Sequence, residues 1–558
     1  MSFFFIVGGI FALSLVLALV RRFIYPRPLP GIPYDRDAAR RIIGDYGIID
    51  GIYKELSEWV YPFTRHRSRQ LKSPIYQYFP GPFSKPHIVV YDPRETADII
   101  MRRTREFDRS MDDGIFQTLL PHSTVSKPVT PEWKVQRRIW QDTMHPTFLN
   151  GVVAKNIYNT AMDLRRFWKI RSTHSGGRPI DIQKDFFDAA LDAIWVATFG
   201  QRLGLVNSQI QVLETGKQFE DTNSHVYDTL GYANEFGKSR KSFWPAFDRW
   251  WTWRSTKYRN YLKVKDEALD RILADTIARF KGTKNDSDST EEQGTCTMDL
   301  VLRKAIRAAQ KAGTPVPDLT KNVEMRDELM LFILSGHETT NVTLQWFVKF
   351  MTNNQEAQTK LRDALKAAFP GDSLPGITEL LSADIPYLSA AIEEGLRCAG
   401  TVGPLLRVTT MDTEIFGYKI PAGIRVSGLA ILSWLPEPIA EERRSLSSQA
   451  AFEKSGGVDW TRTPAAQDLD KYIPERWLKT NEDGKETFDP NVLIHNAFGA
   501  GIRGCFGKRL GTMELRIIVT LIIMSFKFLP VPAELNSFHV NEQLLRAPRQ
   551  CYVKLEAV

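Results

Sequence analysis

The chain has 558 residues, of which 43% are hydrophobic and 25% are charged, so it is long enough to bury a large core. Its formal net charge is +8, but the basic residues are scattered among acidic ones and form no tract with aromatic residues, which argues against a nucleic-acid-binding protein. Four cysteines without a C-x-x-C pair exclude a disulfide framework and a zinc site of closely spaced cysteines. The modest basic excess instead suits an anionic membrane surface or an acidic protein partner.

An uninterrupted uncharged apolar segment, Phe3 to Val20, lies at the start of the chain. As a helix, its 18 residues would reach about 27 Å, nearly the hydrocarbon thickness of a bilayer. Arg21 and Arg22 follow it, whereas a cleaved signal peptide carries basic residues before a shorter apolar segment. We therefore expect residues 1–25 to form a transmembrane signal-anchor, with the N-terminus lumenal and residues 26–558 cytoplasmic. A cleaved signal peptide is the alternative.

Aromatic residues mark two later segments. Trp133 and Arg137, in EWKVQRR, are four residues apart and would share one face of a helix, although a plain amphipathic surface helix has the same spacing. A tryptophan cluster further along is either an interfacial patch that admits lipid-soluble molecules or part of the core. Its members are Trp244, Trp250, Trp251 and Trp253.

Residues 328–351 have a strongly apolar helical pattern that polar residues interrupt between Ser335 and Thr340 (SGHETT). Polar groups in a buried helix are costly unless they are paired, and a mid-helix glycine costs about 1 kcal/mol relative to alanine. The missing Cβ of Gly336 would leave room for a bound diatomic molecule, and the carboxyl of Glu338 beside the hydroxyl of Thr339 can relay protons to it. The alternative is a threonine bonded to the i−4 carbonyl and a solvated glutamate. We take His337 as a structural residue.

An ion pair is predicted in PYLSAAIEEGLR, where Glu394 and Arg397 are three residues apart among apolar neighbours. A buried pair of this kind needs further hydrogen bonds, and Arg476 in PERW is the natural third member. Between these segments, residues 416–423 alternate and turn like a hairpin.

Two polar stretches are expected at the surface. The stretch between Pro436 and Lys471 is rich in serine, alanine and charged residues, and we interpret it as a surface insertion. Residues 281–295 (KGTKNDSDSTEEQGT) have the composition of a low-complexity loop.

The most informative segment is FGAGIRGCFG, residues 498–507. Its glycines at 499, 501, 504 and 507 would allow positive φ angles and a close approach of the backbone to a flat macrocycle. The apolar run from Leu510 to Ile522 predicts a buried helix, whose N-terminus just after Cys505 would favour the thiolate over the thiol. A thiolate ligand donates electron density to haem iron and favours O–O cleavage. The loop therefore predicts Cys505 as the ligand of a haem iron.

The loop around Cys505 resembles the haem-binding motif of the cytochrome P-450 family, and the other motifs occur in the family's order, so the resemblance covers most of the chain. It implies a mainly α fold with a small β region, preceded by one N-terminal transmembrane helix, and it implies haem b (iron protoporphyrin IX) as the cofactor. Residues 335–340 resemble the family's oxygen-activating helix. Glu338 and Thr339 match its acid–alcohol pair and are the candidate catalytic residues.

The resemblance also assigns residues around the haem. Arg407 in PLLRVTT matches the position from which the family reaches a haem propionate, Arg503 is a second candidate, and the Trp133–Arg137 helix resembles the family's Trp-x-x-x-Arg helix. The implied cofactor-binding set is Trp133, Arg137, Arg407, Phe498, Arg503 and Cys505, with Cys505 also the metal ligand. Glu394, Arg397 and Arg476 would be structural. Substrate contacts would lie in residues 108–130, 220–255 and 401–406.

Electrons are expected from another protein, because the chain has no glycine-rich nucleotide fingerprint, no P-loop and no length for a flavin domain. The implied donor is an NADPH-dependent flavoprotein reductase, with cytochrome b5 as a further donor. Basic residues near the motifs would attract an acidic donor, although a solvated mixed-charge face is the alternative reading. They are Lys134, Arg138, Lys508 and Arg509.

The function expected from these features is that of a monooxygenase in the endoplasmic reticulum membrane. The apolar segment 401–406 and Phe332 argue for a lipophilic substrate, such as a terpenoid, steroid or polyketide of secondary metabolism, oxidised with O₂. The alternatives are a P-450-type isomerase or peroxide-rearranging enzyme, a haem-thiolate sensor, and a membrane-tethered interaction protein without haem. The Glu338–Thr339 pair argues against the isomerase and the sensor.

Overall fold

The structure is a computed structural model that describes residues 24–109, 115–217, 230, 245–283, 296–315, 318–428, 439–457, 461 and 463–558. The apolar segment Phe3 to Val20, expected to span the membrane, lies outside these residues. Within the ranges given above, no helix combines the length and the apolar character that a membrane crossing requires.

The described chain is mainly helical, as expected. Its α-helices are α2 (Arg36–Ala39), α3 (Tyr46–Leu56), α4 (Val60–Leu71), α5 (Pro93–Met101), α6 (Ile115–Leu119), α7 (Pro131–Ile139), α8 (Pro146–Phe148), α9 (Ala154–Ser175), α10 (Gln183–Phe199), α11 (Leu205–Thr215), α13 (Pro245–Arg254), α14 (Thr256–Thr283), α15 (Thr297–Ala312), α16 (Val323–Asn353), α17 (Gln355–Ala368), α18 (Ile377–Ser382), α19 (Pro386–Ala399), α20 (Leu446–Lys454) and α21 (Lys508–Ser525). Residues 281–283, expected in a loop, instead end α14, and residues 284–295 lie outside the described chain.

The strands are short and form small sheets. They are β1 (Ile75–Tyr78), β2 (His87–Val90), β3 (Phe107–Asp108), β4 (Ile180–Asp181), β5 (Leu405–Thr409), β6 (Thr413–Ile415), β7 (Tyr418–Ile420), β8 (Arg425–Gly428), β9 (Leu478–Thr480), β10 (Glu486–Phe488), β11 (Phe526–Leu529), β12 (Val540–Glu542), β13 (Arg546–Pro548) and β14 (Tyr552–Ala557). The largest sheet has the order β1-β2-β8-β5-β3, with β2 and β8 parallel and the other pairs antiparallel. A second sheet has the order β11-β14-β4.

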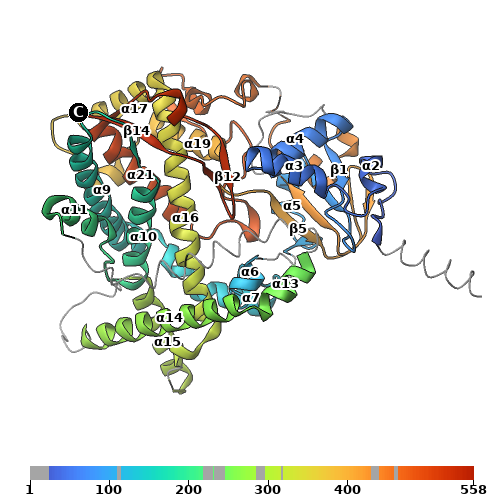
Figure 1. Ribbon diagram of the computed structural model, residues 1–558, viewed down its shortest axis with the longest axis horizontal. Helices are drawn as coiled ribbons and strands as arrows, with labels where there is room; N and C mark the ends of the chain where they lie inside the picture. The colour runs from blue at the N-terminus through green and yellow to red at the C-terminus, as the bar shows by residue number, and fades with distance from the viewer. Residues whose placement is uncertain are drawn as a thin grey trace, which may run out of the picture.

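Figure 1 shows the five-stranded sheet with α2, α3, α4 and α5 on one side of the molecule and most of the other helices on the opposite side. α16 runs through the helical part and packs against α10, α19 and α21. Its second half is buried on every side, with Leu344, Trp346 and Val348 at most 2% exposed, which explains the continuous apolar pattern. The helix begins at Asn322, whose side chain caps the amide of Met325 at 2.9 Å, and it continues unbroken through residues 335–340.

The predicted ion cluster is confirmed between α19 and the 3₁₀ turn Pro474–Trp477. Glu394 is 0% exposed and accepts hydrogen bonds from Nε and Nη2 of Arg397, both at 2.8 Å. It also accepts from Arg476 Nε at 2.9 Å and Trp477 Nε1 at 2.8 Å. These charge-assisted bonds tie the two segments together behind α21, which packs on α19. A hairpin is present here as β6–β7, but it spans residues 413–420 and turns at 416–417, so it begins three residues before the predicted range 416–423.

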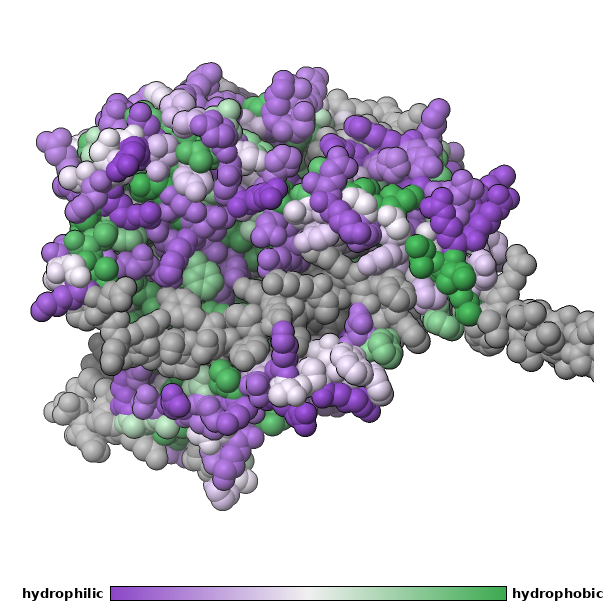
Figure 2. All heavy atoms as spheres, in the orientation of Figure 1, coloured by the Kyte–Doolittle hydropathy of each residue, from purple (hydrophilic) through white to green (hydrophobic). Residues whose placement is uncertain are grey.

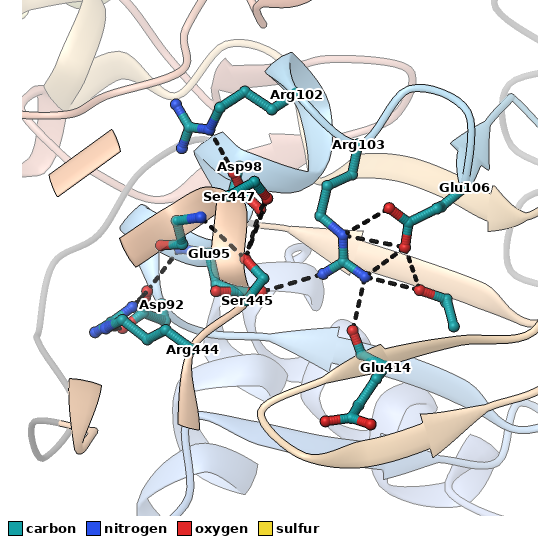
Figure 3. Close-up of polar contacts among 12 residues, drawn as sticks. Asp92, Glu95, Asp98, Arg102, Arg103, Glu106, Glu414, Arg444, Ser445 and Ser447 are labelled. Atoms are coloured by element: carbon teal, nitrogen blue, oxygen red, sulfur yellow. Dashed lines mark hydrogen bonds and ion pairs between the residues drawn. The ribbon is translucent and has the colours of Figure 1, made fainter. Parts of the chain in front are cut away.

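The described residues around α20 lie largely at the surface, as expected for a surface insertion, but a few of their side chains are buried against α5. Figure 3 shows this segment docked on α5 by polar contacts. Arg444 donates two hydrogen bonds of 2.9 Å to the carboxylate of Asp92, and Ser445 and Ser447 each donate one of 2.6 Å to Asp98 Oδ2. Arg444, Asp92 and Asp98 are buried. The polar composition therefore reflects a buried ionic interface as well as solvent contact.

Candidate functional site

The loop of residues 498–507 folds back on itself and presents a cysteine. The Cys505 amide donates to the Phe498 carbonyl at 2.8 Å, and the Cys505 side chain is exposed. Gly501 has a φ of 67°, and a Cβ at this position would lie 2.3 Å from the carbonyl oxygen of Ile100 at the end of α5. Gly501 is therefore required both for its backbone conformation and for the contact with α5.

The expectation of positive φ angles holds for only part of the loop. Gly499 and Gly501 have φ values of 61° and 67°. Gly504 and Gly507 have φ values of −58° and −85°, which any residue can adopt. A Cβ at Gly507 would meet no protein atom within 4 Å, whereas one at Gly504 would lie 3.2 Å from the Gly501 carbonyl. Gly504 is thus a packing requirement of the loop itself.

The pKa of Cys505 shows the expected lowering near the N-terminus of α21 together with a larger opposing effect. Surrounding protein atoms raise the pKa of the Cys505 thiol above its ordinary value, and this outweighs the lowering by the Gly507 amide, Arg137 and Lys508. The N-terminus of α21 alone therefore does not make a thiolate in the protein. A coordinated metal ion deprotonates a thiol outright, so the donor chemistry of Cys505 still suits a haem iron.

α7 holds the predicted Trp133–Arg137 pair against this loop. Thr130 caps the helix by accepting from the Trp133 amide at 3.2 Å. Arg137 Nη2 donates to the Gly504 carbonyl at 3.2 Å, and its guanidinium carbon lies 5.2 Å from the Trp133 ring, so the two side chains share a helix face as predicted. The Trp133 indole donates to the Thr124 carbonyl at 2.9 Å. The role of both residues toward a haem propionate stays a prediction.

The two other predicted propionate partners lie in different surroundings. Arg503 donates to Asp108 Oδ1 from Nε at 3.1 Å and from Nη2 at 2.9 Å, and also to the carbonyls of Thr124 and Lys127. Arg407, on β5, is buried and donates to the Leu406 carbonyl at 2.9 Å. Arg503 thus forms four hydrogen bonds to protein acceptors, which leaves one Nη1 hydrogen for another partner. Arg137, in contrast, forms one protein hydrogen bond among the described residues, so it has donors left for an anion.

The face of α16 that carries Phe332, Ser335 and Thr339 meets the cysteine loop, and we call it the open face of α16. The rings of Phe332 and Phe506 are 6.1 Å apart, so the helix and the residue after Cys505 are neighbours. Ser335 is exposed although it lies in the middle of a helix whose second half is entirely buried. Space is therefore open beside this face, next to the cysteine.

The candidate catalytic residues lie on or next to this face. Thr339 is half-buried, and its hydroxyl donates to the Ser335 carbonyl at 2.7 Å, the i−4 bond considered above as the alternative. Its hydroxyl oxygen can still accept a proton or a hydrogen bond. Glu338 is partly exposed, and its Oε1 lies 3.8 Å from Nε2 of the buried His337. The pair lies on the turn of α16 beside the open face, and its catalytic role stays a prediction.

The prediction that the missing Cβ of Gly336 leaves room for a bound diatomic molecule is wrong. A Cβ at this position would lie 2.5 Å from Cγ1 and 2.8 Å from Cδ1 of Ile194 on α10. The glycine therefore makes room for a neighbouring side chain in the helix–helix contact, and not for a small ligand. The open space lies at Ser335 instead.

Sequence reasoning missed two carboxyl groups of this region. Asp108 was included only in a segment of expected substrate contacts, but it forms the ion pair with Arg503 and also accepts from the Val129 amide at 2.7 Å. Glu514 on α21 accepts a hydrogen bond of 3.0 Å from Thr340 on α16. Neither contact has a local sequence signal, because the partners are far apart along the chain. The one feature of the sequence that could have drawn attention to Glu514 is its position as an acidic residue within the apolar run after Cys505.

The sequence is similar to known proteins over most of its length. The family model described as "Cytochrome P450" matches residues 51–432 and 468–555, on either side of α20. Cytochrome P450 monooxygenase TRI13 of Fusarium sporotrichioides is 30% identical over 98% of this chain and 98% of its own. Cytochrome P450 monooxygenase GME11363 of Pestalotiopsis microspora is 30% identical over 99% of this chain and 98% of its own. A crystal structure of a cytochrome P450 (CYP102L1), 18% identical, has a TM-score of 0.66 and covers 96% of this chain and 100% of its own, which supports the fold alone.

Proposed function

This chain belongs to the cytochrome P450 family of monooxygenases, and from that premise we propose that it inserts one oxygen atom of O₂ into a lipophilic metabolite with electrons from a separate NADPH-dependent flavoprotein reductase. The observation that carries the proposal is the contact between Phe332 and Phe506, at 6.1 Å, which brings the open face of α16 next to Cys505. Haem b bound there would supply the activation of O₂. The fungal relatives, both named as monooxygenases, support the reaction class. We further propose a role in secondary metabolism, with a terpenoid, steroid or polyketide as substrate.

The residues of this chain would have distinct tasks at the site. Cys505 would bind the iron, and Arg137 and Arg407 would neutralise the carboxylates of the macrocycle, since guanidinium groups pair well with carboxylates. Thr339 and Glu338 would hold and pass protons on the open face of α16. Arg503 would mainly hold the cysteine loop to Asp108, because most of its donors are already bonded to protein acceptors.

A lipophilic substrate is supported by the apolar segment before β5. Val402 is 40% exposed, and residues 403–406 are partly exposed. The hydroxyl of Thr401 lies 3.0 Å from that of Thr343, so this segment runs beside α16. Apolar side chains that stay accessible beside a catalytic helix offer contacts for an apolar ligand.

An acidic electron donor is supported by exposed cations around the cysteine loop. Lys508 and Arg509 begin α21, directly after the loop, and Lys134 and Arg138 lie on α7, which contacts the loop through Arg137. All four are exposed. Charge complementarity would steer a flavoprotein reductase, or cytochrome b5, to this surface.

The endoplasmic reticulum membrane is the proposed location, with the catalytic body cytoplasmic. Besides the apolar segment at the start of the chain, α13 supports a membrane contact. Phe247, Trp250 and Trp251 are 44%, 46% and 63% exposed, so these tryptophans are not core residues. Figure 2 shows a pale, near-neutral patch over α13. Tryptophan favours the membrane interface, where its ring is buried in the headgroup layer.

The function is tested by reconstituting the purified full chain with a reductase, NADPH and ¹⁸O₂ on extracts of metabolites. We expect a product with one ¹⁸O atom per turnover, formed with consumption of NADPH. A product with the mass of its substrate would favour the isomerase, and ligand binding without NADPH consumption would favour the sensor. The location is tested separately: an endoglycosidase-sensitive modification at the Asn285 sequon, or release by alkaline extraction, would contradict it.

A further inference from the structure

A cavity of about 610 Å³ lies outside the site described above. Its walls come mainly from α4, α16, α19, β13 and residues 469–473, so it lies where the sheet side of the molecule meets the helical side (Figure 1). Neither Cys505 nor Thr339 lines it. Its first residue on α16, Trp346, follows Thr339 by seven residues, which is about 10 Å along the helix axis. The cavity is therefore separate from the site around Cys505, and its volume suits a small organic ligand.

One wall of the cavity is a stack of aromatic rings. The ring of Phe350 lies 5.0 Å from that of Tyr472 and 6.0 Å from that of Trp346, with angles of 15° and 20° between the ring planes. Phe538 joins the stack 6.3 Å from Phe350, at 28°. Phe538 is 45% exposed, whereas the other three residues are buried. Because the rings are nearly parallel and one keeps an exposed surface, a flat aromatic group can extend the stack.

The part of the cavity formed by α4 contains two arginines. Tyr61 and Arg65 both line the cavity, and they share a helix face because they are four residues apart on α4. Arg546, on β13, lies on the other side of this tyrosine, with its guanidinium carbon 5.6 Å from the Tyr61 ring. The same carbon lies 5.1 Å from the ring of Trp346. Arg546 therefore connects the cationic part of the cavity to the aromatic stack.

The two arginines differ in how far the protein occupies them. Arg546 pairs with Glu58 at 2.6 Å and donates to the Ala399 carbonyl at 2.8 Å, which leaves three of its five N–H groups without an acceptor among the described residues. Arg65 is exposed and forms no hydrogen bond or ion pair with any residue that the structure describes. Glu58 thus neutralises Arg546, and Arg65 supplies one positive charge in excess.

The other charged groups of the lining compensate one another. Arg397 is attracted by Glu394 and by Asp470, and Lys471 pairs with Asp468 at 3.3 Å. The excess charge is therefore the single cation of Arg65, beside the unused donors of Arg546. A ligand with one negative charge and two acceptor oxygens matches this arrangement, and a carboxylate has both properties.

We propose that this cavity binds a small planar aromatic molecule that carries one carboxylate. The ring of the ligand would add to the stack of Phe350 and Phe538. Its carboxylate would accept hydrogen bonds from Arg546 and pair with Arg65, since guanidinium groups bind carboxylates well. Binding at this site does not depend on the proposed monooxygenase reaction.

The first test is calorimetric titration of the full-length holoenzyme with 2-naphthoate, and with 2-naphthamide as its neutral analogue, while the Soret band is recorded. We expect saturable binding of 2-naphthoate without a Soret shift, because the cavity is separate from the iron site. Arg65→Ala should weaken 2-naphthoate by about fivefold and leave 2-naphthamide unchanged, as expected for the loss of one exposed ion pair. Phe538→Ala should weaken both compounds, since both stack on its ring.

Arg69→Ala is the matched control, because Arg69 is another exposed arginine of α4 but does not line the cavity. It should bind both compounds like the wild type. The proposal is overturned if 2-naphthoate does not saturate the wild type, if its only binding event shifts the Soret band, or if Arg65→Ala binds it as tightly as the wild type.

The second test locates the ligand through a cysteine. Cys398 lines the cavity and is partly exposed, whereas Cys296 and Cys551 are 0% exposed. The surrounding protein raises the pKa of Cys398 to about 12, so its labelling by N-ethylmaleimide is followed at about pH 9, where more thiolate is present. Saturating 2-naphthoate should slow this labelling severalfold, as measured by mass spectrometry of the Cys398 peptide. An unchanged rate in the saturated wild type would place the ligand elsewhere and overturn the proposal.

Discussion

Glu394→Ala should remove the centre of the buried ionic cluster between α19 and residues 474–477. The carboxylate accepts two hydrogen bonds from Arg397 and one each from Arg476, the Ile473 amide and the Trp477 indole, all between 2.8 and 2.9 Å. The side chains of Arg397 and Arg476 are only 4% and 3% exposed. Water therefore cannot easily replace the carboxylate as their partner.

The expected cost follows from the charges that the mutation leaves behind. Removing one partner of a buried ion pair costs about 3–5 kcal/mol, because the other charge stays desolvated without compensation. Here two guanidinium groups lose the one carboxylate that pairs with them in the described part of the chain, and Arg397 retains the neutral carbonyls of Leu469 and Lys471. We therefore expect Glu394→Ala to lower the free energy of unfolding by about 5 kcal/mol, near the upper end of that range. This is a large share of the ~5–15 kcal/mol that stabilises a folded protein.

The assay is the free energy of unfolding in urea together with the haem content per protein. Glu394→Ala should yield little haem-loaded protein. Glu556→Ala is the control, because Glu556 pairs with Lys527 on the surface, where the side chains are 51% and 48% exposed, and such pairs contribute at most about 1 kcal/mol. The reasoning would be refuted if the Glu394→Ala protein had normal haem content and lost no more unfolding free energy than the Glu556→Ala protein.

Four further predictions concern the site. Cys505→Ser should abolish the red-shifted Soret band of the reduced CO complex, and its persistence would mean that another residue binds the iron. Thr339→Ala should load haem and consume NADPH but release hydrogen peroxide in place of product; an unchanged ratio of product to NADPH would contradict the proton relay. Gly336→Ala should cost about 1–3 kcal/mol in thermal unfolding through the clash with Ile194, and Ile194→Ala in the same chain should relieve it. For Glu514, the folded pKa is raised from 4.5 to about 8, so wild-type stability should fall with rising pH across that interval, and the advantage of Glu514→Gln should grow there; parallel curves would contradict the raised pKa.

Local patterns in the sequence were enough to predict the elements that carry the chemistry. The loop around Cys505, the apolar helix after it and the helix through residues 335–340 all have the bounds or contacts expected from glycine spacing and helical periodicity. Glu394 and Arg397 were also predictable, because two residues three apart on a helix must meet, and apolar neighbours place them inside. The physical reason is that these features depend on residues close together in the chain.

Predictions that required knowledge of a neighbouring element were the ones that were wrong. Gly336 faces Ile194 of α10, and no pattern around position 336 shows which helix packs there. The insertion around α20 was expected at the surface, and only the placement of α5 shows that its charged residues also form a buried ionic interface. The N-terminus of α21 suggests a thiolate at Cys505, but the protein packed around the thiol has the larger effect on its pKa.

By itself, the sequence predicted the candidate ligand Cys505 and the helix that carries Glu338 and Thr339 from short-range spacing, and its resemblance to a known family predicted the mainly helical fold. Only the tertiary structure decided the partners of the buried charges, namely Asp108 for Arg503 and Thr340 for Glu514. These partners are separated by hundreds or scores of residues, and the free energy of a buried charge depends on which groups surround it in space. Packing therefore raises the pKa of Glu514, and no residue near it in the chain indicated this effect.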